Sequence, residues 1–244
     1  MKKATIFILS VLLLALGAEA GHWTSLNSSG EPFTVRVLET NGERTLLKYT
    51  VNGYFQDEVA IDGRNYTLFK KLPKESMIEE KGFPRLPRIN RAIIIPDEGV
   101  MDFEVISAEF IEIENIEVAP SKGHFSREID PATVPYTFSS VYDEDALFPA
   151  DLVNLREPYI LRDYRGLVVE LNAFQYNPVT KILRICTRAT IEVKKTRAGG
   201  ANVLVRSKPL RKVDPQFHKI YKRRFINYNQ LDYPILLELS LIHI

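Results

Sequence analysis

The segment that says most about the architecture is residues 159–195, YILRDYRGLVVELNAFQYNPVTKILRICTRATIEVKK. It holds two or three strand-like runs and no pattern with a helical period. The last two runs are joined by YNPVTK, in which Asn177-Pro178 begins a turn and Thr180 helps to close it. Consecutive strands joined by a tight turn predict antiparallel pairing.

The same alternation of apolar and polar residues extends through the earlier part of the chain. Further predicted strands are 33–39 (FTVRVLE), 45–51 (TLLKYTV), 91–96 (RAIIIP, short and apolar) and 101–118 (MDFEVISAEFIEIENIEV, one face apolar and the other acidic). Asn41-Gly42 is a hairpin-type turn signal between the first two. Strands at this spacing, without alternating helices, predict an all-β fold, an antiparallel β-sandwich or jelly-roll-like barrel.

One short helix is expected near the C-terminus, in PQFHKIYKRRFINYN, residues 215–229. At the helical period Phe217, Ile220, Tyr221 and Phe225 share one face. We expect this face to pack on the sandwich.

The first twenty residues have the three parts of a secretory signal peptide. Two lysines precede an apolar run at 6–16, and Ala18 and Ala20 form an A-x-A cleavage signal. The run is too short to span a bilayer comfortably, and no later stretch is long and apolar enough, so we expect no membrane span after signal removal. The predicted protein is exported through a bacterial inner membrane to the periplasm, the cell surface or the medium.

Charge and cysteine content exclude several classes of function. The net charge of +1 gives no general attraction to nucleic acid, and a single cysteine cannot form an internal disulfide. A basic stretch at 194–224 is interpreted as a solvated face that could dock on an acidic partner.

No self-contained active site is apparent in the sequence. Cys186 lies in a predicted strand between Arg184 and Arg188, without a histidine motif, and is interpreted as a strand cysteine on a half-exposed face. The acidic run 143–145 lacks the glycine and distal glutamate of a calcium loop, so a solvated loop is expected. We predict no metal, no cofactor and no catalytic residue.

Residues 119–136, APSKGHFSREIDPATVPY, interrupt the strand pattern with a loop rich in turn formers. Pro120, Pro131 and Pro135 restrict its backbone, and Arg127 lies near its middle. From these residues alone, Arg127 is most simply an exposed loop residue.

Several stretches together resemble the N-terminal propeptide of the gingipain family of secreted bacterial cysteine proteases. They are KGFPRLPRINRAIIIP, APSKGHFSREIDPATVPY, SVYDEDALFPADLVNLREPYILRDYRGLVVELNAFQYNPVTKILRICT and IYKRRFINY. The resemblance implies a β-sandwich prodomain that assists folding of the attached protease and keeps it latent. It also implies that a basic loop residue enters the specificity pocket of the protease, and it places Arg127 there, with Lys122 as runner-up and Ser121, Gly123, Ser126 and Glu128 as the surrounding inhibitory loop.

The signal sequence and the resemblance together predict three parts of the chain: a signal peptide at 1–20, a propeptide domain at 21–230 and an unmatched apolar tail at 231–244. The partner is a gingipain-like catalytic domain, in cis in a parent precursor or in trans. The tail leaves two explanations open, a truncated or frame-disrupted precursor and a stand-alone inhibitor.

A different class of function is a freestanding secreted β-sandwich that binds carbohydrate or a cell-surface partner. Such a module usually exposes a row of aromatic side chains. Trp23 is the only tryptophan, at the predicted mature terminus, which argues against this alternative.

Overall fold

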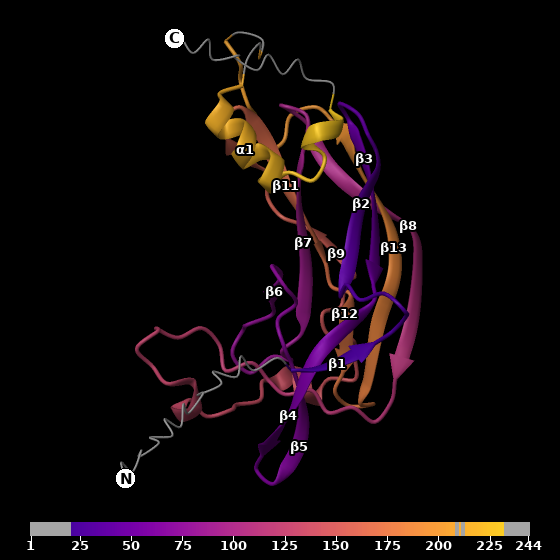
Figure 1. Ribbon diagram of the computed structural model, residues 1–244, viewed down its shortest axis with the longest axis vertical. Helices are drawn as coiled ribbons and strands as arrows, with labels where there is room; N and C mark the ends of the chain where they lie inside the picture. Colours follow the sequence, from indigo (N-terminus) through magenta and orange to yellow (C-terminus); the bar gives the residue numbers. More distant parts are fainter. Residues whose placement is uncertain (1–20, 208–209, 211–212, 232–244) are drawn as a thin grey trace, which may run out of the picture.

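The computed structural model describes residues 21–207, 210 and 213–231, which form two five-stranded antiparallel sheets and a smaller three-stranded one (Figure 1). The predicted signal peptide, with Ala18 and Ala20, and residues 232–244 of the predicted tail lie outside the described residues. Of the helices in the described part, none has the length and apolar character needed to cross a bilayer.

The first large sheet is built around its longest strand, β13. This strand pairs with β12 and β3 along one edge and with β8 along the other, and β2 pairs with β3. The bounds are β2 Phe33–Thr40, β3 Arg44–Val51, β8 Val100–Ile113, β12 Phe174–Asn177 and β13 Ile182–Arg197.

The second large sheet is centred on β11 and β7, and the third lies at one end of the molecule (Figure 1). The second sheet contains β6 Ser76–Met77, β7 Pro87–Ile94, β9 Val153–Leu155, β10 Tyr159–Leu161 and β11 Tyr164–Leu171. The third contains β1 His22–Ser25, β4 Gly53–Ile61 and β5 Arg64–Phe69. The helical segments are α1 Pro215–Arg224 and the short 3-10 turns η1 Pro131–Thr133, η2 Ser140–Asp143 and η3 Tyr228–Gln230.

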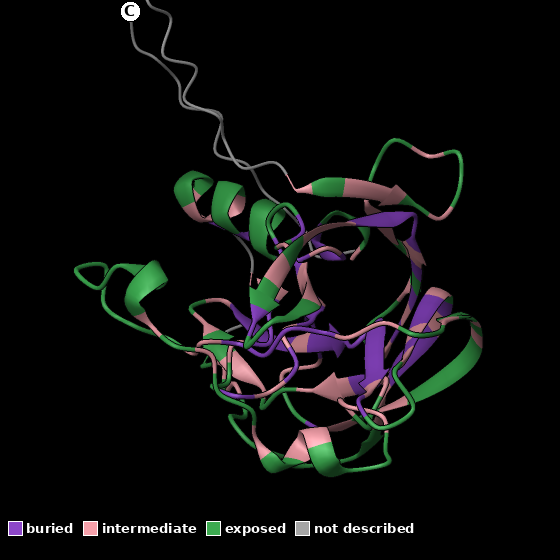
Figure 2. Ribbon diagram, turned by 90° about the horizontal axis from the view of Figure 1, so that it is seen from below, coloured by how far each residue is buried: buried purple, intermediate pink, exposed green. Residues whose placement is uncertain are grey.

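The core lies between the two large sheets, where the inward residues of both form one cluster (Figure 2). Leu47 and Ile191 come from the first sheet, and Ile93 and Val169 from the second, and all four are fully buried. The predicted antiparallel all-β fold with one short helix near the C-terminus is therefore confirmed.

Both predicted turns form through asparagine side chains. Asn41 Oδ1 accepts hydrogen bonds from the backbone N–H groups of Glu43 and Arg44, at 2.9 and 2.8 Å. Asn177 Oδ1 accepts from those of Val179 and Thr180, both at 3.1 Å. Local side-chain to backbone bonds of this kind are why asparagine at the start of a turn is a dependable signal.

The strand predicted at 101–118 differs from β8 in two ways. Among the described residues β8 pairs only with β13, so it is an edge strand, and it ends at Ile113. Its pairing also contains irregularities, opposite Cys186/Arg188 and Thr190/Ile191. As a result Val105 and Ile111, which the alternation placed on the apolar face, are each 37% exposed.

The predicted C-terminal helix is confirmed as α1, with one error in its face. Asp214 caps the helix by accepting from the Gln216 N–H at 2.8 Å. Tyr221 and Phe225, the C-cap residue of the helix, are buried, but Ile220 is 37% exposed. Successive residues are about 100° apart in a helix, so Ile220 falls at the margin of a narrow face centred near Tyr221.

Candidate functional site

The Arg127 loop, residues 119–136, leaves and rejoins the sandwich at one place. Ser121 N donates to Phe83 O at 2.8 Å, and Gly82 N donates to Ser121 O at 2.9 Å. The returning chain closes on the same glycine, because Ser139 N donates to Gly82 O at 3.0 Å. Ser121 is itself only 2% exposed. Both ends of the loop are thus fixed to the turn at Gly82 and Phe83, so its position relative to the sheets is defined.

Beyond this base the loop projects away from the sheets, at the end of the molecule where β4 and β5 lie (Figure 1). Residues 124–133 are exposed without exception. In Figure 2 they form the green projection that includes η1. The tip is therefore available to another protein surface.

The loop is held together by Lys122 and Gly123. The Lys122 ammonium donates to the carbonyl oxygen of Pro131 at 2.8 Å and lies 4.4 Å from the centre of the Tyr136 ring. Gly123 has φ of +84°, and a Cβ there would lie 2.9 Å from the Cβ of Lys81. Lys122, the runner-up for the pocket role, thus directs its charge into the loop and connects its two sides.

Arg127 and Glu128 occupy the centre of a tight turn at the tip. Ile129 N donates to Ser126 O at 3.0 Å, which closes the turn, and Glu128 N is 3.4 Å from Ser126 Oγ. Arg127 is exposed and makes no hydrogen bond or ion pair within residues 21–207, 210 and 213–231. Its guanidinium is therefore presented with its hydrogen-bonding capacity unused.

Sequence reasoning missed three other features of the tip. Phe125 and Ile129 are 38% and 44% exposed on either side of the turn, so both place apolar surface at the tip. Asp130 caps η1 by accepting from Ala132 N at 2.9 Å. The Asp130-Pro131 pair is a recognisable start signal for a helical turn, whereas nothing in the sequence marks Phe125 and Ile129 as exposed.

The predicted exposure of Cys186 is wrong, because its side chain is only 1% exposed. The β-bulge between Cys186 and Arg188 turns both Ile185 and Cys186 into the core. Burial raises the pKa of the thiol to about 11, and Sγ donates to the Arg188 carbonyl oxygen at 3.2 Å. The neighbouring arginines lower this pKa less than burial raises it, so the group is a protonated core thiol and a poor nucleophile.

Two other sequence predictions concern a metal site and an aromatic surface. In the described residues no three His, Cys, Asp or Glu side chains are arranged to hold a metal ion. Asp145, in the acidic run 143–145, accepts instead from Asn177 Nδ2 at 2.8 Å. Trp23 packs on Phe55, with ring centres 4.9 Å apart, and lies over Gly53. The tryptophan therefore belongs to the small sheet.

Comparison with known protein families identifies the family of this chain. The family model Propeptide_C25 matches residues 25–233, most of the chain. The chain belongs to this family. It is thus a propeptide domain of a C25 cysteine protease, and its 244 residues include no catalytic domain.

The curated relatives are proteases from Porphyromonas gingivalis. Gingipain R1 is 42% identical over 151 residues, which cover 62% of this chain and 15% of the relative. Gingipain R2 is 41% identical over 156 residues, which cover 64% of this chain and 21% of the relative. The chain therefore spans less than a quarter of the length of these relatives, and the predicted resemblance to gingipain propeptides is confirmed.

Solved structures agree with this assignment. The complex of the pro- and mature domains of RgpB from Porphyromonas gingivalis matches with a TM-score of 0.73 and 34% identity, over 80% of this chain and 97% of the matched chain. A structure of gingipain K from the same organism, described as an insight into zymogenic latency, matches with a TM-score of 0.59 and 18% identity, over 72% and 99% of the two chains. The second match supports the fold alone.

Proposed function

We propose that this domain keeps a gingipain-like cysteine protease latent by placing Arg127 in the specificity pocket of the protease, and that it assists folding of that protease. The observation that carries the proposal is the presentation of Arg127. Its guanidinium is exposed and unpaired within the described residues, at the tip of a loop whose two ends are both fixed at Gly82.

The chemistry of arginine suits this role. A protease selective for arginine needs a carboxylate in its pocket, and the planar guanidinium can bind it through two parallel hydrogen bonds. The exposed apolar side chains of Phe125 and Ile129 add contact area on both sides of the pocket. Because Lys122 and Gly82 already order the loop, docking costs less conformational entropy than it would for a free peptide.

The turn also explains how the loop could inhibit without being cleaved. Cleavage after arginine requires the attacking thiolate to meet the carbonyl carbon of Arg127 in a near-attack geometry. That carbonyl belongs to the Arg127–Glu128 peptide, which is enclosed by the hydrogen bond from Ile129 N to Ser126 O. A closed turn of this kind resists the rearrangement that the reaction needs, so the loop would act as a pseudo-substrate.

The protease could be reached in cis, as part of a longer precursor, or in trans. The matched RgpB structure is a complex of pro- and mature domains, which supports a direct prodomain–protease contact here. The signal-like sequence at 1–20 supports export before the complex acts. We assign the propeptide domain to residues 21–230.

The test is inhibition of mature gingipain R1 by the purified chain and by its Arg127→Ala variant. Loss of a buried, paired arginine at an interface costs about 2–4 kcal/mol, so the inhibition constant should rise about 30- to 1,000-fold. Arg127→Lys should fall in between, because a lysine keeps the charge without the two-point contact. Arg197→Ala, at an exposed site at the end of β13, is the matched control and should inhibit like the wild type.

The thermal unfolding of all variants should coincide, because Arg127 makes no contact that supports the fold among the described residues. Equal inhibition by Arg127→Ala and wild type would reject the pocket role. Absence of any inhibition by the wild-type chain would reject the latency function itself.

A further inference from the structure

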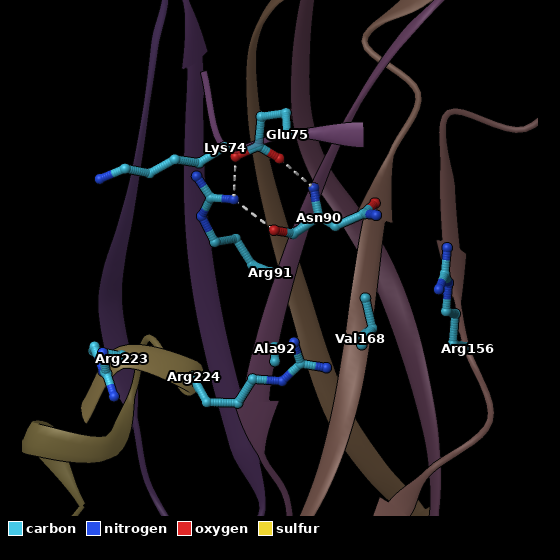
Figure 3. Close-up of a pocket in the computed structure, with 9 residues that line it drawn as sticks. All are labelled: Lys74, Glu75, Asn90, Arg91, Ala92, Arg156, Val168, Arg223 and Arg224. Carbon is cyan, nitrogen blue, oxygen red and sulfur yellow. Dashed lines mark hydrogen bonds and ion pairs between the residues drawn. The ribbon is translucent and has the colours of Figure 1, made fainter. Parts of the chain in front are cut away.

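A pocket of about 400 Å³ lies between the second sheet and the last turn of α1 (Figure 3). Five separate parts of the chain contribute to it. Its lining residues are Lys74 and Glu75 from the β5–β6 connection, Asn90, Arg91 and Ala92 from β7, Arg156 directly after β9, Val168 from β11, and Arg223 and Arg224 from α1. We call it the cationic pocket, because five of these side chains are basic and one is acidic.

Part of this positive charge is neutralised within the fold. Glu75, whose side chain is 2% exposed, accepts from the Asn90 N–H at 2.9 Å and from Arg91 Nη1 at 2.7 Å. Arg156 forms an ion pair with Glu170, on β11. Both carboxylates are therefore paired with arginines that line the pocket.

The other three cations have no carboxylate partner among the described residues. Arg224 Nε donates to the Tyr159 hydroxyl at 3.2 Å, and Arg223 Nε donates to the Lys219 carbonyl oxygen at 3.3 Å. Lys74 makes no hydrogen bond within the same residues. The distal nitrogens of both arginines therefore keep unused donors.

A structural explanation covers only part of this arrangement. Basic residues in the last turn of a helix are stabilised by the helix dipole, which accounts for Arg223 and Arg224 in isolation. Ion pairs with Glu75 and Glu170 account for Arg91 and Arg156. Neither explanation accounts for Lys74, which has no carboxylate partner among the described residues and brings a further positive charge to the same hollow. A concentration of like charge at a hollow is instead typical of a site for an anionic group.

The position of the pocket indicates what occupies it. Helix α1 and the Arg127 loop project on the same side of the sandwich in both views (Figures 1 and 2). A protein that receives Arg127 at one end can therefore extend along this side and reach Arg223 and Arg224. We propose that the cationic pocket is a second docking site for the protease domain and takes a segment of it that carries aspartate or glutamate side chains.

The ligand class follows from the donor set. Guanidinium groups bind carboxylates through two parallel hydrogen bonds, and the pocket offers two arginines with free distal nitrogens. The small apolar side chains of Ala92 and Val168 leave room between the charged groups. The volume exceeds what one small anion needs and lies in the range of sites that take a side-chain-sized ligand or larger.

The inference rests on the proposed function, and its test separates the two. The variant is Arg223→Gln/Arg224→Gln, and the matched control is Lys219→Gln/Lys222→Gln, which removes the same charge from exposed positions of the same helix that do not line the pocket. Binding of each full chain to mature gingipain R1 is measured by surface plasmon resonance at low and high salt. Arg127→Ala is included as the probe of the loop.

The expected result is a rise in Kd of about tenfold or more for the arginine double variant at low salt, mainly through slower association, which disappears at high salt. The lysine control should change Kd by less than about twofold. Equal effects of the two double variants would show only general charge attraction and would overturn the docking site, whatever Arg127→Ala does.

A second arm uses N-acetyl hexaglutamate amide as the probe, so that the pocket is tested even if the loop proposal fails. The peptide should bind the wild type and the lysine control, and should bind the arginine double variant much more weakly. Binding of inorganic phosphate with the same affinity would overturn the peptide assignment. Peptide binding without any change in protease binding would overturn the protease as the occupant.

Discussion

The contribution of Lys122 can be separated from that of Arg127 by one substitution. Lys122→Met keeps the length and apolar stem of the side chain and removes the ammonium that joins Pro131 O to the Tyr136 ring. The base of the loop, fixed at Gly82, is left intact. We expect the tip to sample other conformations while the sandwich stays folded.

The size of the effect follows from the two lost contacts. A hydrogen bond from a charged donor contributes about 1.5–3 kcal/mol when buried, and this one lies at the surface, which reduces its contribution. A cation–π contact at an exposed site adds about 0.5–1 kcal/mol. A total of about 1–2 kcal/mol must then be supplied on binding, so the inhibition constant should rise about 5- to 30-fold.

The assay follows inhibition of mature gingipain R1 over time, with mass spectrometry to detect cleavage after Arg127. Lys122→Met should inhibit transiently and be cut, whereas Lys122→Arg, which keeps a donor over Tyr136, should behave like the wild type. Lys71→Met, at an exposed site outside the loop, controls for loss of charge. Unchanged inhibition by Lys122→Met would refute a role for the internal contacts. Complete loss, as large as that of Arg127→Ala, would mean that Lys122 itself enters the pocket.

Three further predictions concern the fold. Asn227→Leu leaves the buried N–H and C=O of Ile94 without the amide that binds them at 2.8 and 3.0 Å, so urea unfolding should show a loss of about 2–5 kcal/mol. The Cys186 thiol, with its pKa raised to about 11, should react with iodoacetamide at pH 8.5 at least about 100-fold more slowly in the native protein than in urea. Hydrogen bonding from Lys194 lowers the pKa of Glu192 in the folded protein below its ordinary value of 4.5. The ionised Glu192 carboxylate therefore stabilises the fold at neutral pH, and this stabilisation is lost as the pH falls from 4.5 through the lowered pKa. The difference in Tm between wild type and Glu192→Gln should therefore shrink on acidification.

The parts of the fold that the sequence predicts are those fixed by local interactions. Strand alternation and the asparagine turns at Asn41 and Asn177 depend on neighbours a few residues away, and both are found. The helix is found because Phe217, Tyr221 and Phe225 recur at the helical period. Errors occur where the outcome depends on distant pairing. The edge position of β8 and the bulge after Cys186 are set by which strands meet, and no local pattern encodes this.

The candidate site also contains features that local sequence predicts and features that depend on distant segments. The proline-rich loop and Arg127 are visible in the sequence, but their support is not. Gly82 closes the loop from a distant segment, and Lys122 reaches across to Pro131 only once the loop has folded. The sequence predicts the cationic pocket only in part, because the basic stretch at 194–224 includes Arg223 and Arg224 but not the cations from the second sheet and its connections.

The proposed latency function depends on how the domain presents Arg127 to the protease. A flexible peptide with the sequence of the loop would offer the same arginine, but it would lose more conformational entropy on binding and could adopt the extended form that is cleaved. In the proposed role the sandwich removes both disadvantages, because the two ends of the loop are fixed at Gly82 and the Arg127–Glu128 peptide is enclosed in the turn from Ser126 to Ile129. A second anchor at the cationic pocket would add to this by raising the effective concentration of the loop at the protease, without strengthening any contact of Arg127.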